Sequence, residues 1–84
     1  MKQIVHSPES LGAFLRRVRK FKHLTQSMVG EGSFKIDQTT VSSIEQGAKG
    51  TRLDTVFRLL ASLDLELIVQ DKILHKNNKE RDQW

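Results

Sequence analysis

Amide and hydroxyl side chains gather in one short stretch near the middle of the 84-residue chain: Gln38, Thr39, Ser42 and Ser43. Val41 and Ile44 lie three residues apart in this stretch, so a helix places them on one inward face and leaves the polar side chains mostly outward. Small uncharged donors and acceptors, rather than Lys and Glu, are unusual on a purely solvated helix face. They suit contact with base edges in a DNA major groove.

Two short helices around a tight turn are predicted to hold this stretch between residues 24 and 47. Thr25 is a hydroxyl that can cap the first helix, and Asp37 is a carboxylate that can cap the second and favourably meet its dipole. Gly47 follows the last periodic residue, where a left-handed cap is expected. The pattern predicts a helix-turn-helix unit.

Three segments of this region resemble the helix-turn-helix of the Cro/repressor-like (XRE) family: Leu24-Thr25-Gln26, Gln38-Thr39-Thr40-Val41-Ser42 and Ile44-Glu45-Gln46-Gly47. The resemblance runs from about residue 7 to residue 63. It implies a mainly α, lambda-repressor-like domain of about four helices, with a short C-terminal strand that forms an intersubunit sheet in a dimer.

A narrower similarity is to HipB-like antitoxins, the partners of HipA-type kinases. It is carried by the opening Ile4-Val5-His6-Ser7-Pro8, by the segment from Leu60 to Leu67, and by a chain that ends on Trp84. It implies a repressor of the operon that encodes antitoxin and kinase, with Trp84 docking on a HipA-like kinase toxin. A terminal aromatic residue without any role is the plainer alternative.

Under this interpretation, each dimer spans a palindromic operator in double-stranded DNA, with half-sites about 34 Å apart. Gln38 is the best candidate for a base contact, because a carboxamide can pair with adenine, and Thr39 and Ser43 are placed to read neighbouring bases. The remaining candidates are expected to contact phosphates: Gln26, Ser27, Thr40, Ser42 and Lys49.

The family resemblance also implies an ion pair between Arg19 and Glu45. In related proteins an arginine six residues before the Thr-Gln position pairs with the glutamate of the Ile-Glu dipeptide. Such a pair would tie the first helix to the end of the second helix of the motif. The alternative is two unrelated surface charges.

Between the two helices the sequence departs from the family pattern. The usual small alanine is Gly30, the usual turn glycine is Lys35, and one extra residue lies within residues 30–33. Two glycines weaken a helix by roughly 1 kcal/mol each relative to alanine, yet they let a loop absorb an insertion through positive φ. Phe34 and Ile36 are expected to plug the turn. The insertion also motivates a competing hypothesis, a protein-interaction module with weakened DNA binding.

The flanking helices are predicted from periodicity and caps. Ser7-Pro8-Glu9 marks the start of a helix to about residue 22, followed by apolar residues at helical spacing: Leu11, Phe14, Leu15, Val18 and Phe21. Its second half is basic, which fits either a solvated face or phosphate contacts. Thr51 and Asp54 resemble a capping box for a helix at about residues 52–63, whose wide apolar stripe suggests packing on two sides.

The segment LELIV at residues 65–69 has nearly alternating polarity, with Leu65, Leu67 and Val69 on one face. A lone strand leaves its backbone groups unpaired, so pairing with a second copy over about residues 64–70 is predicted to make a homodimer. The alternative is pairing with residues 3–5 of the same chain. The domain is expected to span residues 1–70, and residues 71–84 to form a polar, disordered tail.

Composition limits the other function classes. Eighty-four residues without cysteine allow one domain with one small core, and the net charge of +4 suits a polyanion partner. No apolar run approaches a membrane span and no export signal opens the chain, so a cytoplasmic protein is expected. The three histidines are scattered and no catalytic or metal-ligand motif occurs, so neither an enzyme nor a metal or cofactor site is predicted. A stand-alone regulator of the XRE family remains the alternative to an antitoxin.

Overall fold

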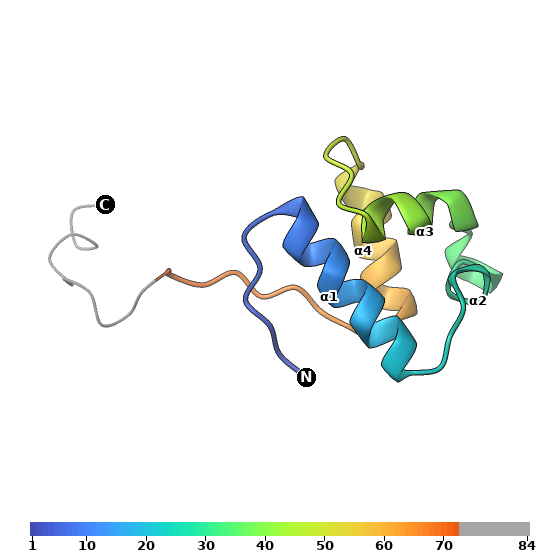
Figure 1. Cartoon of the computed structure of the whole chain (residues 1–84), viewed down its shortest axis with the longest axis horizontal. Helices are drawn as coiled ribbons and strands as arrows, with labels where there is room; N and C mark the ends of the chain where they lie inside the picture. The colour runs from blue at the N-terminus through green and yellow to red at the C-terminus, as the bar shows by residue number, and fades with distance from the viewer. Residues whose placement is uncertain (73–84) are drawn as a thin grey trace, which may run out of the picture.

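Four α-helices form the body of the computed structural model, which describes residues 1–72 (Figure 1). They are α1 (Pro8–Phe21), α2 (Gln26–Val29), α3 (Gln38–Glu45) and α4 (Leu53–Ser62), with a short 3-10 helix, η1 (Gly32–Phe34), between α2 and α3. The expected mainly α architecture of about four helices is confirmed.

The start of α1 follows from the residues that precede and open it. The Ser7 hydroxyl accepts a hydrogen bond from the Ser10 backbone N–H at 3.0 Å, and the Ser10 hydroxyl accepts one from the Ser7 N–H at 3.1 Å. Pro8 supplies the first turn with a fixed φ and no N–H to satisfy. The cap at Ser7 is therefore confirmed, and Ser10 closes it reciprocally.

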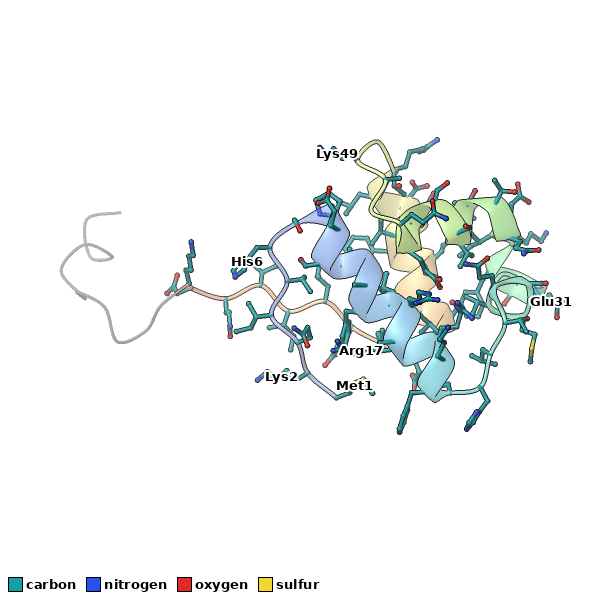
Figure 2. All side chains as sticks on the ribbon, in the orientation of Figure 1. Met1, Lys2, His6, Arg17, Glu31 and Lys49 are labelled. Atoms are coloured by element: carbon teal, nitrogen blue, oxygen red, sulfur yellow. The ribbon has the colours of Figure 1, made fainter. Side chains whose placement is uncertain are left out.

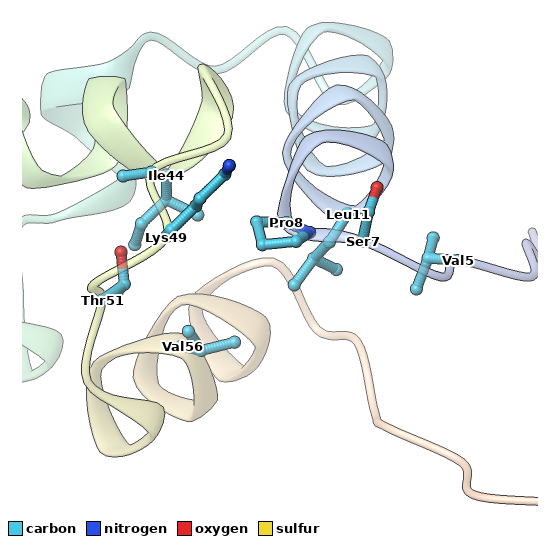
Figure 3. Close-up of a pocket in the computed structure, with 9 residues that line it drawn as sticks. Val5, Ser7, Pro8, Leu11, Ile44, Lys49, Thr51 and Val56 are labelled. Atoms are coloured by element: carbon cyan, nitrogen blue, oxygen red, sulfur yellow. The ribbon is translucent and has the colours of Figure 1, made fainter.

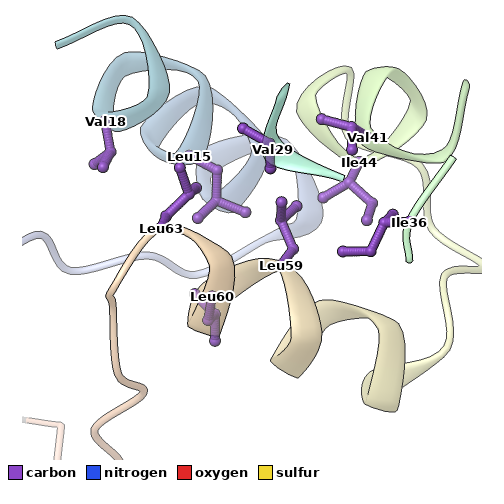
Figure 4. Close-up of a cluster of buried hydrophobic side chains, with 9 residues drawn as sticks. All are labelled: Leu15, Val18, Val29, Ile36, Val41, Ile44, Leu59, Leu60 and Leu63. Carbon is purple, nitrogen blue, oxygen red and sulfur yellow. The ribbon is translucent and has the colours of Figure 1, made fainter. Parts of the chain in front are cut away.

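The core forms where one stripe of α1 meets α3 and α4 (Figure 4). Its buried apolar residues are Leu15, Val18, Val29, Ile36, Val41, Ile44, Leu59, Leu60 and Leu63. Leu11 and Phe14 pack against it in part, as the helical spacing predicts.

One apolar prediction was wrong at the edge of this core. Phe21 is 69% exposed, because it is the last residue of α1 and follows Val18 and Arg19, the last buried residues of the helix. In α4, Leu53 and Phe57 are 65% and 47% exposed, so this single chain covers only one side of the wide stripe.

The predicted helix caps of the motif have different outcomes. The Thr25 hydroxyl accepts from the Met28 N–H at 3.1 Å, as predicted. Asp37 occupies the cap position of α3 with extended backbone, but its side chain makes no cap hydrogen bond. The capping box at Thr51 and Asp54 was wrong: α4 begins at Leu53 after Arg52, whose guanidinium instead pairs with Asp54 at 3.2 Å on the surface.

Residues 65–70 form no strand in this single chain, and neither do residues 3–5. Pairing of these two segments is therefore not observed in the described chain. The Leu65 side chain packs partly on the core, whereas Leu67 and Val69 are 48% and 88% exposed. A strand that pairs with a second copy requires that copy, so the intersubunit sheet stays a prediction. Trp84 and the rest of the predicted tail beyond residue 72 lie outside the described residues.

Candidate nucleic-acid interface

The outer face of α3 carries the side chains that were predicted to read bases. Gln38, Thr39 and Ser43 are exposed, while Val41 and Ile44 on the opposite face are buried in the core. This arrangement leaves an uncharged amide and two hydroxyls free at the surface of a helix that is anchored from behind.

The predicted phosphate contacts differ in their exposure. Ser27 is exposed at the start of α2, whereas Thr40 and Ser42 are half-buried on α3. The Ser42 hydroxyl accepts a hydrogen bond from the Gln46 amide at 3.1 Å, which leaves its own O–H free to donate. Lys49 is exposed in the loop between α3 and α4, where Figure 2 shows it projecting from the body of the protein.

Arg19 and Glu45 are brought together by α1 and the last residue of α3. Arg19 Nε lies 2.6 Å from Glu45 Oε2, and its Nη2 donates to Oε1 at 3.0 Å. A third guanidinium nitrogen, Nη1, donates to the Leu24 carbonyl at 2.8 Å, before α2. The Arg19 and Glu45 side chains are only 9% and 3% exposed. One guanidinium therefore links α1 to the end of α3 and to Leu24, just before α2.

The chemistry of this pair keeps Arg19 charged. Its hydrogen bond to Glu45 raises the pKa of the guanidinium above the ordinary value, against the opposing effect of burial. A bidentate charged pair of this kind has a defined geometry. It fixes the C-terminal end of α3 relative to α1.

Gln26 belongs to the same network, which the sequence did not indicate. Its Nε2 donates to Glu45 Oε1 at 3.1 Å, and the residue is half-buried. Because a carboxamide has two N–H donors, one remains for a phosphate. Gln26 is thus positioned by Glu45 rather than free on the surface.

Gly12 is a second residue that sequence reasoning missed. A Cβ at this position would lie 2.2 Å from the Ile44 carbonyl oxygen and 2.8 Å from that of Glu45. The backbones of α1 and α3 therefore approach as closely as glycine permits. The available signal was a glycine inside an otherwise strongly periodic helix.

The loop after α3 begins at Gly47, whose φ of 90° matches the predicted left-handed cap. It borders a shallow pocket of about 210 Å³ between the start of α1, this loop and α4 (Figure 3). The lining is mostly apolar, from residues such as Val5, Leu11 and Val56, with Lys49 among the polar members. In residues 1–72 no group of three His, Cys, Asp or Glu side chains gathers to hold a metal ion, and no helix is long and apolar enough to cross a membrane.

The helices, the turn and the exposed α3 face define a helix-turn-helix domain of the lambda-repressor type. No family model matches the chain. It is, however, 33% identical over 69 residues to the antitoxin HipB of Escherichia coli K12, covering 82% of this chain and 77% of that protein. The HipB of Escherichia coli O6:H1 is also 33% identical over 69 residues, with 72% of its length covered. The chain belongs to the HipB antitoxin family.

Solved structures of this family superpose on most of the chain. A HipB–O4 20mer complex gives a TM-score of 0.77 at 33% identity, covering 83% of this chain and 97% of the HipB chain. A HipA–HipB–O2–O3 complex gives a TM-score of 0.79 at 32% identity, covering 86% of this chain and all of the matched chain.

Proposed function

We propose that this protein is a DNA-binding antitoxin that acts as a homodimer in the cytoplasm, represses its own operon and binds a HipA-like kinase. The observation that carries the proposal is the exposed amide and hydroxyl face of α3, held from behind by the Arg19–Glu45 pair. It is supported by relatives that are HipB antitoxins and by their solved complexes with HipA. The roles proposed for its polar residues are in binding, and no catalytic role is proposed.

The proposed division of labour follows position on the motif. Gln38, Thr39 and Ser43 contact base edges, since they are exposed on the outer face of α3. Phosphate contacts fall to the residues around that face: Gln26, Ser27, Thr40, Ser42 and Lys49.

Operator preference tests the function directly. The full chain is titrated against a labelled duplex that contains the palindrome upstream of its own gene, and against a scrambled duplex of equal length. We expect tighter binding to the palindrome, and an affinity that falls steeply as salt increases because phosphate contacts release counterions. Equal binding to both duplexes, or none, would instead favour the protein-interaction module.

Gln38→Ala is expected to reduce operator affinity by about 1–3 kcal/mol, because the variant loses a bidentate base contact. Affinity for the scrambled duplex is expected to change little. The matched control is Gln3→Ala, which removes an exposed amide outside the motif and outside the proposed dimer segment at residues 64–70. A competition assay in which Gln38→Ala keeps the wild-type preference would overturn the assignment of Gln38.

Dimerisation is proposed to pair the segment at residues 65–69 with its copy. Leu67→Asp is expected to raise the dimer dissociation constant by roughly tenfold or more. Dimerisation would then have to remove two carboxylates from water, one from each chain. Sedimentation equilibrium measures the constant, and Glu66→Gln on the alternate face is the control. A wild-type chain that stays monomeric at high concentration would contradict the dimer.

The kinase partner is tested by copurification. We expect the untagged product of a neighbouring kinase-like gene to copurify with the full chain, and Trp84→Ala to weaken its retention, since Trp is a favoured interface anchor. A chain that binds its operator but retains no kinase would fit a stand-alone regulator.

A further inference from the structure

The turn between α2 and α3 is held from outside the motif by Arg58 of α4. Its Nη1 donates to the Phe34 carbonyl at 3.2 Å and to the Lys35 carbonyl at 3.3 Å. Its Nη2 donates to the Thr55 hydroxyl, one turn earlier on α4, at 3.3 Å. Thr55 therefore orients the guanidinium while the other nitrogen bridges two consecutive carbonyls of the turn.

The turn needs an outside support because its own conformation is unfavourable. Lys35 has φ 52° and ψ 57°, the left-handed region that a side chain with a Cβ rarely adopts. Asp37 at the start of α3 makes no side-chain cap hydrogen bond that would fix the entry to the helix locally. Both observations leave the backbone just before α3 dependent on contacts from elsewhere.

Gly30 supplies the other support of the turn. The Ile36 N–H donates to the Gly30 carbonyl at 3.0 Å, and a Cβ on Gly30 would lie 1.8 Å from the Ile36 carbonyl oxygen. The backbone at residue 36 thus folds back onto the end of α2. The Phe34 side chain packs partly against the core, and Arg58 holds the backbone carbonyls of Phe34 and Lys35.

The two ends of α3 are consequently held by different elements. Glu45 at its C-terminal end is fixed by Arg19 and Gln26, whereas the N-terminal end, with Gln38 and Thr39, follows directly from the turn. We propose that Arg58 is a positioning residue for DNA reading, which fixes the direction of the N-terminal end of α3 by clamping the left-handed turn. The effect of Arg58 on DNA binding rests on the proposed function.

Removing the clamp is expected to affect operator recognition more than general DNA binding. In Arg58→Ala the turn samples other conformations, and only the fraction with α3 correctly placed binds the operator at full strength. With the two hydrogen bonds to the turn lost, we expect operator affinity to fall about tenfold. Affinity for a scrambled duplex and the salt dependence should stay close to wild type, because the proposed phosphate contacts at Gln26, Ser27 and Lys49 lie outside α3.

Two further variants separate positioning from other roles. Arg58→Lys keeps a charge and a donor at the same place and is expected to retain most of the operator preference. Arg16→Ala removes the same charge from an exposed site on α1, where the described chain gives the guanidinium no hydrogen bond. An equal loss on both duplexes with a smaller salt dependence in Arg58→Ala would make Arg58 a phosphate contact and overturn the proposal.

A double variant tests the link to the strained turn. Glycine adopts positive φ without steric cost, so Lys35→Gly should recover part of the operator affinity lost in Arg58→Ala. If Arg58→Ala loses operator affinity and Lys35→Gly restores none of it, Arg58 does not act by holding Lys35 in its left-handed conformation.

Hydrogen exchange in the free protein separates this proposal from the proposed function. We expect Arg58→Ala to speed amide exchange at residues 34–40 and to leave residues 44–46 unchanged. Unchanged exchange at the turn would overturn the clamp whatever the DNA result. Faster exchange there in a protein that prefers no operator would leave the clamp standing and overturn the proposed function.

Discussion

Glu45→Ala is expected to destabilise the fold by about 3–5 kcal/mol, because it leaves a buried guanidinium without its carboxylate. Arg19 is 7% exposed and cannot turn to water without leaving the core. The same substitution also removes the hydrogen-bond acceptor of the Gln26 amide. A domain of this size has little stability in reserve, so the melting temperature should fall by at least about 12 °C.

Thermal unfolding followed by circular dichroism measures this loss, at one protein concentration for all variants because a dimer unfolds in a concentration-dependent way. Glu31→Ala is the matched control, since it removes an exposed carboxylate from the loop after α2 (Figure 2). The double variant Arg19→Met, Glu45→Met should recover much of the stability, because no charge then remains buried. A Glu45→Ala protein within about 1 kcal/mol of wild type would show that the pair adds little to the fold.

Local signals predicted α1, α2 and α3 because the relevant contacts lie close in sequence. Ser7 and Thr25 bond to backbone groups three residues away, and the spacing of Val41 and Ile44 defines the inner face of α3. The pairing of Arg19 with Glu45 spans 26 residues and came from family resemblance, not from periodicity.

The contacts that sequence reasoning missed are tertiary. Arg58 reads as one exposed charge on α4, and only the fold brings it to the Lys35 carbonyl. Gly12 and Gly30 read as weak points of helices, yet each allows a close backbone approach. The predicted strand at residues 65–69 differs in kind, since its predicted partner is a second chain. No local sequence pattern specifies these tertiary contacts. The sequence therefore predicts the helices better than it predicts how they pack together.

Gly12→Ala is expected to destabilise the fold by up to about 3 kcal/mol, although alanine is the better helix former by about 1 kcal/mol. The new methyl group would meet two backbone carbonyls, at 2.2 Å and 2.8 Å, and backbone cannot turn aside as a flexible side chain does. The α1 and α3 helices would have to separate, which would loosen Val18 and Ile44 in the core.

Gly50→Ala is the control for this substitution, because nothing lies within 4 Å of a Cβ at that position. It should leave stability unchanged or raise it slightly, by about 0.4–1 kcal/mol, through a stiffer unfolded chain. Urea unfolding of both variants and the wild type measures the free energy of unfolding. It shows whether the gain in helix propensity or the loss of packing between α1 and α3 is larger in Gly12→Ala. If Gly12→Ala were as stable as wild type, the helices would have room to separate, and the close contact between α1 and α3 would not be what holds α3 in place.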